Sequence, residues 1–69
     1  NSEDDIFFYK KILDNYKKIM KDKFLIVFEI GYNQKDKLIK ILKENNLYKY
    51  SKFYKDLAKL DRILVVDTI

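Results

Sequence analysis

Residues 24–31, Phe-Leu-Ile-Val-Phe-Glu-Ile-Gly, decide the fold of this chain. The run is apolar except for Glu29, is rich in β-branched and aromatic side chains, and stops at Gly31. A strand with one face in water would alternate between apolar and polar residues, so this continuous run predicts a strand over 24–30 that is buried on both faces. Strands of that kind lie inside α/β sheets, with helices above and below.

Residues 2–21, on the N-terminal side of this strand, have the spacing of an amphipathic helix. Phe7 and Phe8 widen its apolar stripe, so we expect the helix to pack on more than one surface. The stripe itself recurs at steps of three and four, through Ile6, Tyr9, Ile12, Leu13, Tyr16, Ile19 and Met20.

The C-terminal side predicts one more helix and two more strands. Residues 34–45 have helical spacing and end at an asparagine pair, a residue type that tolerates the left-handed conformation of a helix end. Residues 48–55 mix aromatic residues with lysines and predict a strand near an edge. After a connector over 56–61, residues 62–67 form a second strand that is apolar on both faces. The expected order is α-β-α-β-β.

This order restricts the topology of the sheet. A strand-helix-strand unit closes as a right-handed crossover, so 24–30 and 48–55 should run parallel. The short connector makes 62–67 antiparallel to 48–55, and its apolar character places it in the middle. We therefore predict a three-stranded mixed sheet in the order 24–30, 62–67, 48–55, with two helices.

Two helices cover only one face of such a sheet, and strand 24–30 is left at an edge. An uncovered apolar face beside an uncharged edge strand is what a monomer avoids. The chain is therefore expected either to oligomerise or to be the end of a larger α/β domain whose other elements lie upstream.

Composition excludes several classes of chemistry. The 69 residues contain no Cys and no His, which removes disulfides, thiolate catalysis, imidazole acid-base chemistry and the usual zinc sites. With one Gly and no Pro, the sequence holds no glycine-rich phosphate loop. Its net charge is +4, but Arg62 is the only arginine among 15 cationic residues, which disfavours nucleic-acid binding. No apolar run is long enough for a membrane span and no signal sequence opens the chain, so a cytoplasmic location is expected.

Three stretches then resemble one enzyme family, in its order and spacing. They are residues 3–13 (EDDIFFYKKIL), 28–34 (FEIGYNQ) and 55–66 (KDLAKLDRILVV). They are similar to the E-D-G-L-x-F-Y-R-x-I, E-I-G-x-x-Q and D-L-A-G-x-D-R motifs that close the release-factor glutamine methyltransferases, the HemK family. Asp5 stands where the first motif has Gly, Lys10 where it has Arg, and Lys59 where the last motif has Gly.

The resemblance implies that residues 1–69 are a partial domain, the C-terminal part of a Rossmann-like class I methyltransferase fold. Such enzymes transfer a methyl group from S-adenosylmethionine to the glutamine of the Gly-Gly-Gln motif of peptide chain release factors. The family's glycine-rich cofactor loop and Asn-Pro-Pro-Tyr substrate motif lie upstream of this segment. The segment alone is therefore expected to bind no cofactor and to be inactive, and to require the upstream part of the same domain as its partner.

Ligands of open α/β sheets lie beyond the carboxyl ends of the parallel strands. Those ends bring Tyr32, Asn33 and the 56–61 connector to one edge. The candidate residues at this site edge are Glu29, Gly31, Gln34, Asp56, Asp61 and Arg62. None is predicted to be catalytic, to bind the cofactor or to ligate a metal.

Each candidate also has a structural alternative. Glu29, a carboxylate that ends a buried strand, could cap the next helix or pair with a lysine. Gln34 is favoured as a helix-start residue over a substrate contact. Arg62 is expected to pair with Asp56 or Asp61, a surface contact of about 0–1 kcal/mol, with docking of a release factor as the functional alternative.

A second hypothesis is that the chain does not derive from an enzyme. The chain could be a small basic α/β binding module that dimerises and contacts RNA or an acidic protein. The tyrosines and lysines of 48–55 could then form a stacking platform for single-stranded nucleic acid, although a half-buried strand with a solvated face is favoured. Both hypotheses predict self-association of the isolated chain.

Overall fold

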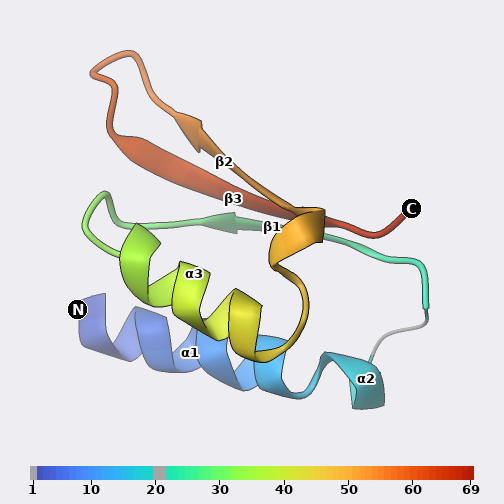
Figure 1. The fold of residues 1–69 in the computed structure, drawn as a ribbon. Coiled ribbons are helices and arrows are strands. Elements are labelled where there is room, and N and C mark those ends of the chain that lie inside the picture. Colours follow the sequence, from blue (N-terminus) through green and yellow to red (C-terminus); the bar gives the residue numbers. More distant parts are fainter. Residues whose placement is uncertain (1, 20–21) are drawn as a thin grey trace.

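The computed structural model describes residues 2–19 and 22–69, which form a three-stranded sheet with helices on one of its faces (Figure 1). The elements are α1 (Ser2–Asp14), α2 (Tyr16–Ile19), β1 (Leu25–Glu29), α3 (Lys35–Glu44), the 3-10 turn η1 (Tyr48–Tyr50), β2 (Ser51–Lys55) and β3 (Asp61–Asp67). No helix in the described part of the chain is both long and apolar enough to cross a membrane.

The expected order of the strands is confirmed, but the prediction of a mixed sheet is wrong, because both pairs of neighbouring strands are antiparallel. The strands lie in the order β1-β3-β2, and β3 is antiparallel to both neighbours. Because β1 and β2 both run opposite to β3, they are parallel to each other as predicted, but β3 separates them. No parallel pair is therefore hydrogen-bonded within the described sheet.

The expected continuous helix over 2–21 is wrong, because it breaks at Asn15. The side-chain amide of Asn15 donates to the Lys11 carbonyl at 2.7 Å, and its backbone N–H bonds to the Ile12 carbonyl, a 3-10-type pattern. Asparagine side chains compete in this way with the regular i to i−4 bonds. The described residues therefore form three α-helices instead of two, and Met20 and Lys21 of the expected helix lie outside them.

The strand expected over 48–55 begins only at Ser51. Residues 48–50 form a 3-10 turn, in which the Tyr50 N–H bonds to the Leu47 carbonyl and the Ser51 hydroxyl donates to the Tyr48 carbonyl at 2.7 Å. The shorter strand follows from this turn, since its backbone groups are used locally.

The core lies between the sheet and the helices. Alternate residues of β1 and its flanks point into it and are buried, as are two residues of β3. The buried apolar set is Tyr9, Leu13, Phe24, Ile26, Phe28, Ile30, Leu38, Ile41, Leu42, Leu47, Leu64 and Val66. Each fully buried aliphatic side chain contributes about 1.5–3 kcal/mol, so this one layer accounts for most of the apolar stabilisation.

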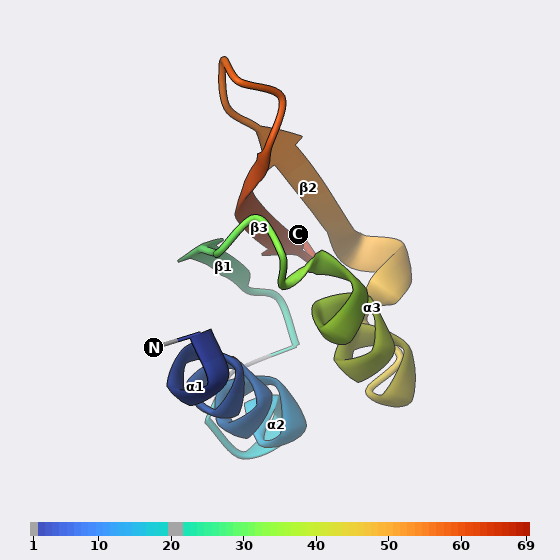
Figure 2. The same ribbon diagram turned by 90° about the vertical axis from the view of Figure 1, so that its left-hand side faces the viewer.

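Strand β1 is buried on one face only, which corrects the expectation of two buried faces. Leu25 and Val27 are 56% and 59% exposed, because the helices all lie on the other side of the sheet (Figure 2). The register places them on one face with Val65, Ile63 and Tyr54. We call these five residues the open face. The prediction that the helices leave one apolar face of the sheet uncovered is confirmed for the described residues.

Candidate functional site

Loops from two parts of the chain meet at one end of the sheet. Strand β1 ends there at Glu29 and β2 at Lys55, while β3 begins there at Asp61. Figure 1 shows the turn after β1, the β2–β3 loop and the N-terminus at this same end. The Ile30 N–H bonds to the Arg62 carbonyl at 2.8 Å and joins the two loops. We call this end the carboxyl edge.

Gln34 and Gly31 close the turn after β1. The Gly31 N–H donates to the Gln34 Oε1 at 2.7 Å, and the Gln34 N–H donates to the Gly31 carbonyl at 3.0 Å. Gln34 is only 2% exposed and precedes the first turn of α3. A Cβ at Gly31 would lie 3.2 Å from the Asn33 Oδ1 and 3.3 Å from the Gln34 carboxamide, closer than ordinary van der Waals contact, so a larger residue here would require these side chains to shift.

Asp56 organises the β2–β3 loop. Its Oδ1 accepts hydrogen bonds from the N–H groups of Ala58 and Leu60, at 2.9 and 3.0 Å. Its Oδ2 accepts a bond from the Arg62 Nε at 2.9 Å. The Leu60 N–H and then the Arg62 guanidinium lower the pKa of the Asp56 carboxyl, because both bond to its charged form.

The pairing expected for Arg62 within the hairpin is therefore made with Asp56, not with Asp61. Asp61 lies nearest Lys35 of α3, at 3.8 Å, which is an ion-pair distance and too long for a hydrogen bond. Its Oδ1 is buried without a hydrogen-bond partner in the described structure. The sequence did not predict the Lys35 contact, since it depends on how α3 lies against β3.

Arg62 also lies over the ring of Tyr32, with 5.8 Å between the guanidinium carbon and the ring centroid. Tyr32 is 58% exposed, and the Arg62 side chain is 43% exposed. A cation over an aromatic face is attracted by the ring quadrupole. Sequence reasoning placed Tyr32 at this edge but missed its contact with Arg62; the one arginine in a lysine-rich chain was the available signal.

Glu29 is the one candidate that the structure separates from the others. Its side chain is exposed, and the register places it on the same side of the sheet as the open face, opposite Ile63. It neither caps α3, whose N-cap is Gln34, nor pairs with a lysine of the described residues. Only its backbone carbonyl has a role in the packing, because it accepts a hydrogen bond from the Tyr9 hydroxyl of α1.

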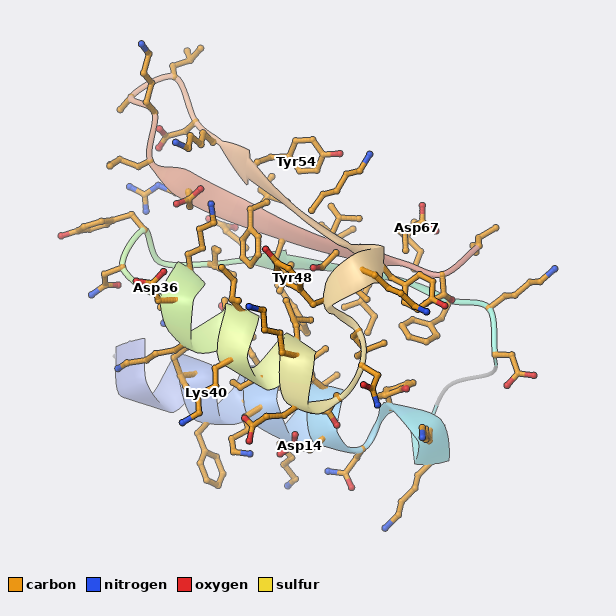
Figure 3. The ribbon with its side chains drawn as sticks, in the orientation of Figure 1. Asp14, Asp36, Lys40, Tyr48, Tyr54 and Asp67 are labelled. Atoms are coloured by element: carbon orange, nitrogen blue, oxygen red, sulfur yellow. The ribbon has the colours of Figure 1, made fainter. Side chains whose placement is uncertain are left out.

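A shallow hollow of about 180 Å³ lies at the carboxyl edge between the turn and α3. Asp36, which lines it, is labelled at the start of α3 in Figure 3. The lining of the hollow is polar and consists of Tyr32, Asn33, Lys35, Asp36 and Asp61. Pockets that hold cofactor-sized molecules measure about 300–1,000 Å³, so this hollow does not hold a nucleoside-sized ligand. The geometry of the edge suits contact with another surface better than it suits enclosure of a small molecule.

Comparison with known proteins gives three similar curated sequences. A release factor glutamine methyltransferase of Fusobacterium nucleatum is 39% identical over 62 residues, 90% of this chain and 17% of the relative. One of Clostridium botulinum is also 39% identical over 62 residues, 90% of this chain and 22% of the relative. A bifunctional methyltransferase of Rickettsia bellii is 33% identical over 67 residues, 97% of this chain and 12% of the relative.

No family model and no solved structure matches the chain. The chain spans less than a quarter of the length of each of these relatives. The resemblance that the three stretches predict is confirmed: in sequence, this chain matches the C-terminal segment of the release factor glutamine methyltransferases, the HemK family.

Proposed function

We propose that this chain is the C-terminal part of a class I methyltransferase that methylates the Gly-Gly-Gln glutamine of peptide chain release factors in the cytoplasm. The observation that carries the proposal is the 39% identity to two release factor glutamine methyltransferases over 90% of the chain. The resemblance implies a mostly parallel sheet whose last strand is an antiparallel insertion, and the order of the strands here, with an antiparallel β3 between β1 and β2, agrees with it.

The methyl donor of the parent enzyme, S-adenosylmethionine, does not fit the residues present here. The sequence has a single Gly and no glycine-rich loop, and the hollow at the carboxyl edge is about 180 Å³. The residues upstream would hold the cofactor and carry the catalytic groups. The role of this segment is then structural, together with any contact made from its carboxyl edge.

The open face and the free edge of β1 support a partner in the same domain. The Thr68 N–H bonds to the Phe24 carbonyl and the Ile30 N–H to the Arg62 carbonyl, so these even-numbered positions of the strand bond toward β3. Because backbone groups alternate in direction along a strand, those of Leu25 and Val27 are directed at the free edge. A strand from the upstream part of the parent enzyme would form hydrogen bonds with these backbone groups. Upstream helices of the parent enzyme would cover the open face.

The test uses the full-length protein that contains this sequence. Incubation with a release factor and isotope-labelled S-adenosylmethionine should add one methyl group to the glutamine of the Gly-Gly-Gln peptide, as detected by mass spectrometry. The 69-residue chain alone should transfer none and should show no heat of S-adenosylmethionine binding in calorimetry. A full-length protein that leaves this glutamine unmodified, or a cofactor-binding 69-residue chain, would contradict the proposal.

A further inference from the structure

Exposed aromatic, cationic and apolar side chains lie on the two loops of the carboxyl edge. Tyr32 lies in the turn after β1, and Arg62 is the second residue of β3, next to the β2–β3 loop. Leu57, the residue after Asp56 in that loop, is fully exposed. We call Tyr32, Leu57 and Arg62 the edge patch.

The guanidinium of Arg62 is restrained, but most of its hydrogen-bond donors have no acceptor among the described residues. Within the described residues it donates only its Nε–H, to Asp56, and its terminal amino groups have no acceptor. A guanidinium carries five N–H donors in a planar fork, so most of them remain available to a partner. The bond to the Asp56 carboxylate and the contact with the Tyr32 ring restrain the side chain, which reduces the conformational entropy lost when a partner binds.

Folding of the loop does not account for this arrangement. Asp56 already bonds to the N–H groups of Ala58 and Leu60, and its own N–H bonds to the Leu60 carbonyl, so the loop is closed without Arg62. Half-exposed ion pairs contribute little to stability. A lysine at position 62 would keep the charge, as the other 14 cationic residues of the chain do, but would lose the planar fork.

We propose that the edge patch docks the protein substrate of the parent enzyme, the release factor, outside the catalytic pocket. This inference rests on the proposed function. Arg62 would donate to a carboxylate on the release factor, while Tyr32 and Leu57 would pack against an apolar side chain beside it. Tyrosine and arginine are the residue types that most often dominate the energetics of protein interfaces.

The position and charge of the patch favour a protein over RNA. Open α/β sheets bind their ligands beyond the carboxyl ends of their parallel strands, and the patch lies beyond the carboxyl ends of β1 and β2, which run parallel to each other. Arg62 is paired with Asp56 and Lys35 with Asp61, and Arg62 is the one arginine of the sequence, so the edge offers a single guanidinium fork where phosphate-binding surfaces use several. One carboxylate on a protein surface matches one such fork.

The test compares variants of the full-length enzyme with matched controls. Arg62→Gln and Tyr32→Ala should each lower kcat/KM for the intact release factor about tenfold, which corresponds to about 1.4 kcal/mol, through a higher KM. Lys40→Gln removes one positive charge and Tyr48→Ala one phenol ring from exposed positions outside the edge patch, and both should change nothing. The KM for S-adenosylmethionine and the rate on a short Gly-Gly-Gln peptide should stay unchanged, whereas a merely structural defect would alter both.

The outcomes separate the two proposals. If the wild-type enzyme methylates the release factor and both Arg62→Gln and Tyr32→Ala have its kcat/KM for that protein, the docking role is wrong and the proposed function stands. Equal losses on the peptide and on the intact protein would also overturn docking. A labelled RNA that binds the wild-type enzyme but not the Arg62→Gln variant would assign the patch to nucleic acid instead. A wild-type enzyme without activity on the release factor overturns the proposed function, and docking with it.

Discussion

Lys59 carries local strain at a position where the similar family motif has glycine. Its φ is 64°, in the left-handed region, at the tip of the β2–β3 loop. A residue with a Cβ pays roughly 1–2 kcal/mol for this conformation, and glycine avoids that cost. Part of the benefit of glycine is lost, because its greater conformational freedom favours the unfolded chain. We expect Lys59→Gly to raise the free energy of unfolding by about 0.5–1 kcal/mol. Urea unfolding would measure this, and Lys55→Gly in the adjacent strand should instead destabilise the chain.

The Asp56 carboxyl makes stability depend on pH in the acid range. Its pKa is lowered in the folded state by the Leu60 N–H and by Arg62, so the unfolded chain binds more protons there. The stabilisation is present above the unfolded pKa of about 3.9 and is lost as the pH falls through the folded pKa. The urea midpoint should therefore fall between pH 5 and pH 2, roughly the range in which a salt-bridged aspartate loses its contribution. Asp56→Asn should show a smaller fall, and an equal fall in both proteins would contradict this role.

At the scale of elements, the break between α1 and α2 provides a test of why the helix ends. If the Asn15 side chain causes it by bonding the Lys11 carbonyl, Asn15→Ala should extend one helix through to Ile19. The circular dichroism signal at 222 nm should then become more negative, since alanine is the best helix former. Asn33→Ala, in the turn after β1, is the control and should leave the signal unchanged. An unchanged signal in Asn15→Ala would mean that tertiary packing imposes the break.

The elements show how far sequence reasoning reaches in this chain. The apolar run at 24–30 and the short 56–61 connector were enough to predict the order of the strands and their directions. The same run led to the wrong prediction that both faces of the strand are buried in this chain. Leu25 and Val27 are apolar, but apolar character alone does not tell whether the layer that covers them belongs to this chain or to another part of the protein. Spacing along the chain could relate Arg62 to Asp56, but it could not place Tyr32 under Arg62 or Lys35 beside Asp61, which depend on how separate elements pack.

At the scale of the whole molecule, we expect the open face to make the isolated chain self-associate. Leu25, Val27, Ile63 and Tyr54 are exposed on one side of the sheet, next to the free edge of β1. Figure 3 shows Tyr54 on the side of the sheet away from the helices. Apolar patches and unpaired strand edges of this kind bind a second copy when their usual partner is missing.

Val27→Lys tests this directly, because position 27 lies at the centre of β1 and its side chain belongs to the open face. Light scattering of the wild-type 69-residue chain at about 50 micromolar, where micromolar affinities are well populated, should give a mass above 8.4 kDa. A charge in the middle of the face must be desolvated on association, so Val27→Lys should return the mass to that of a monomer. Asn33→Lys adds the same charge in an exposed turn and should leave the association intact. A wild-type chain that stays monomeric would show that the open face does not drive association, and the case for an upstream layer would then rest on sequence alone.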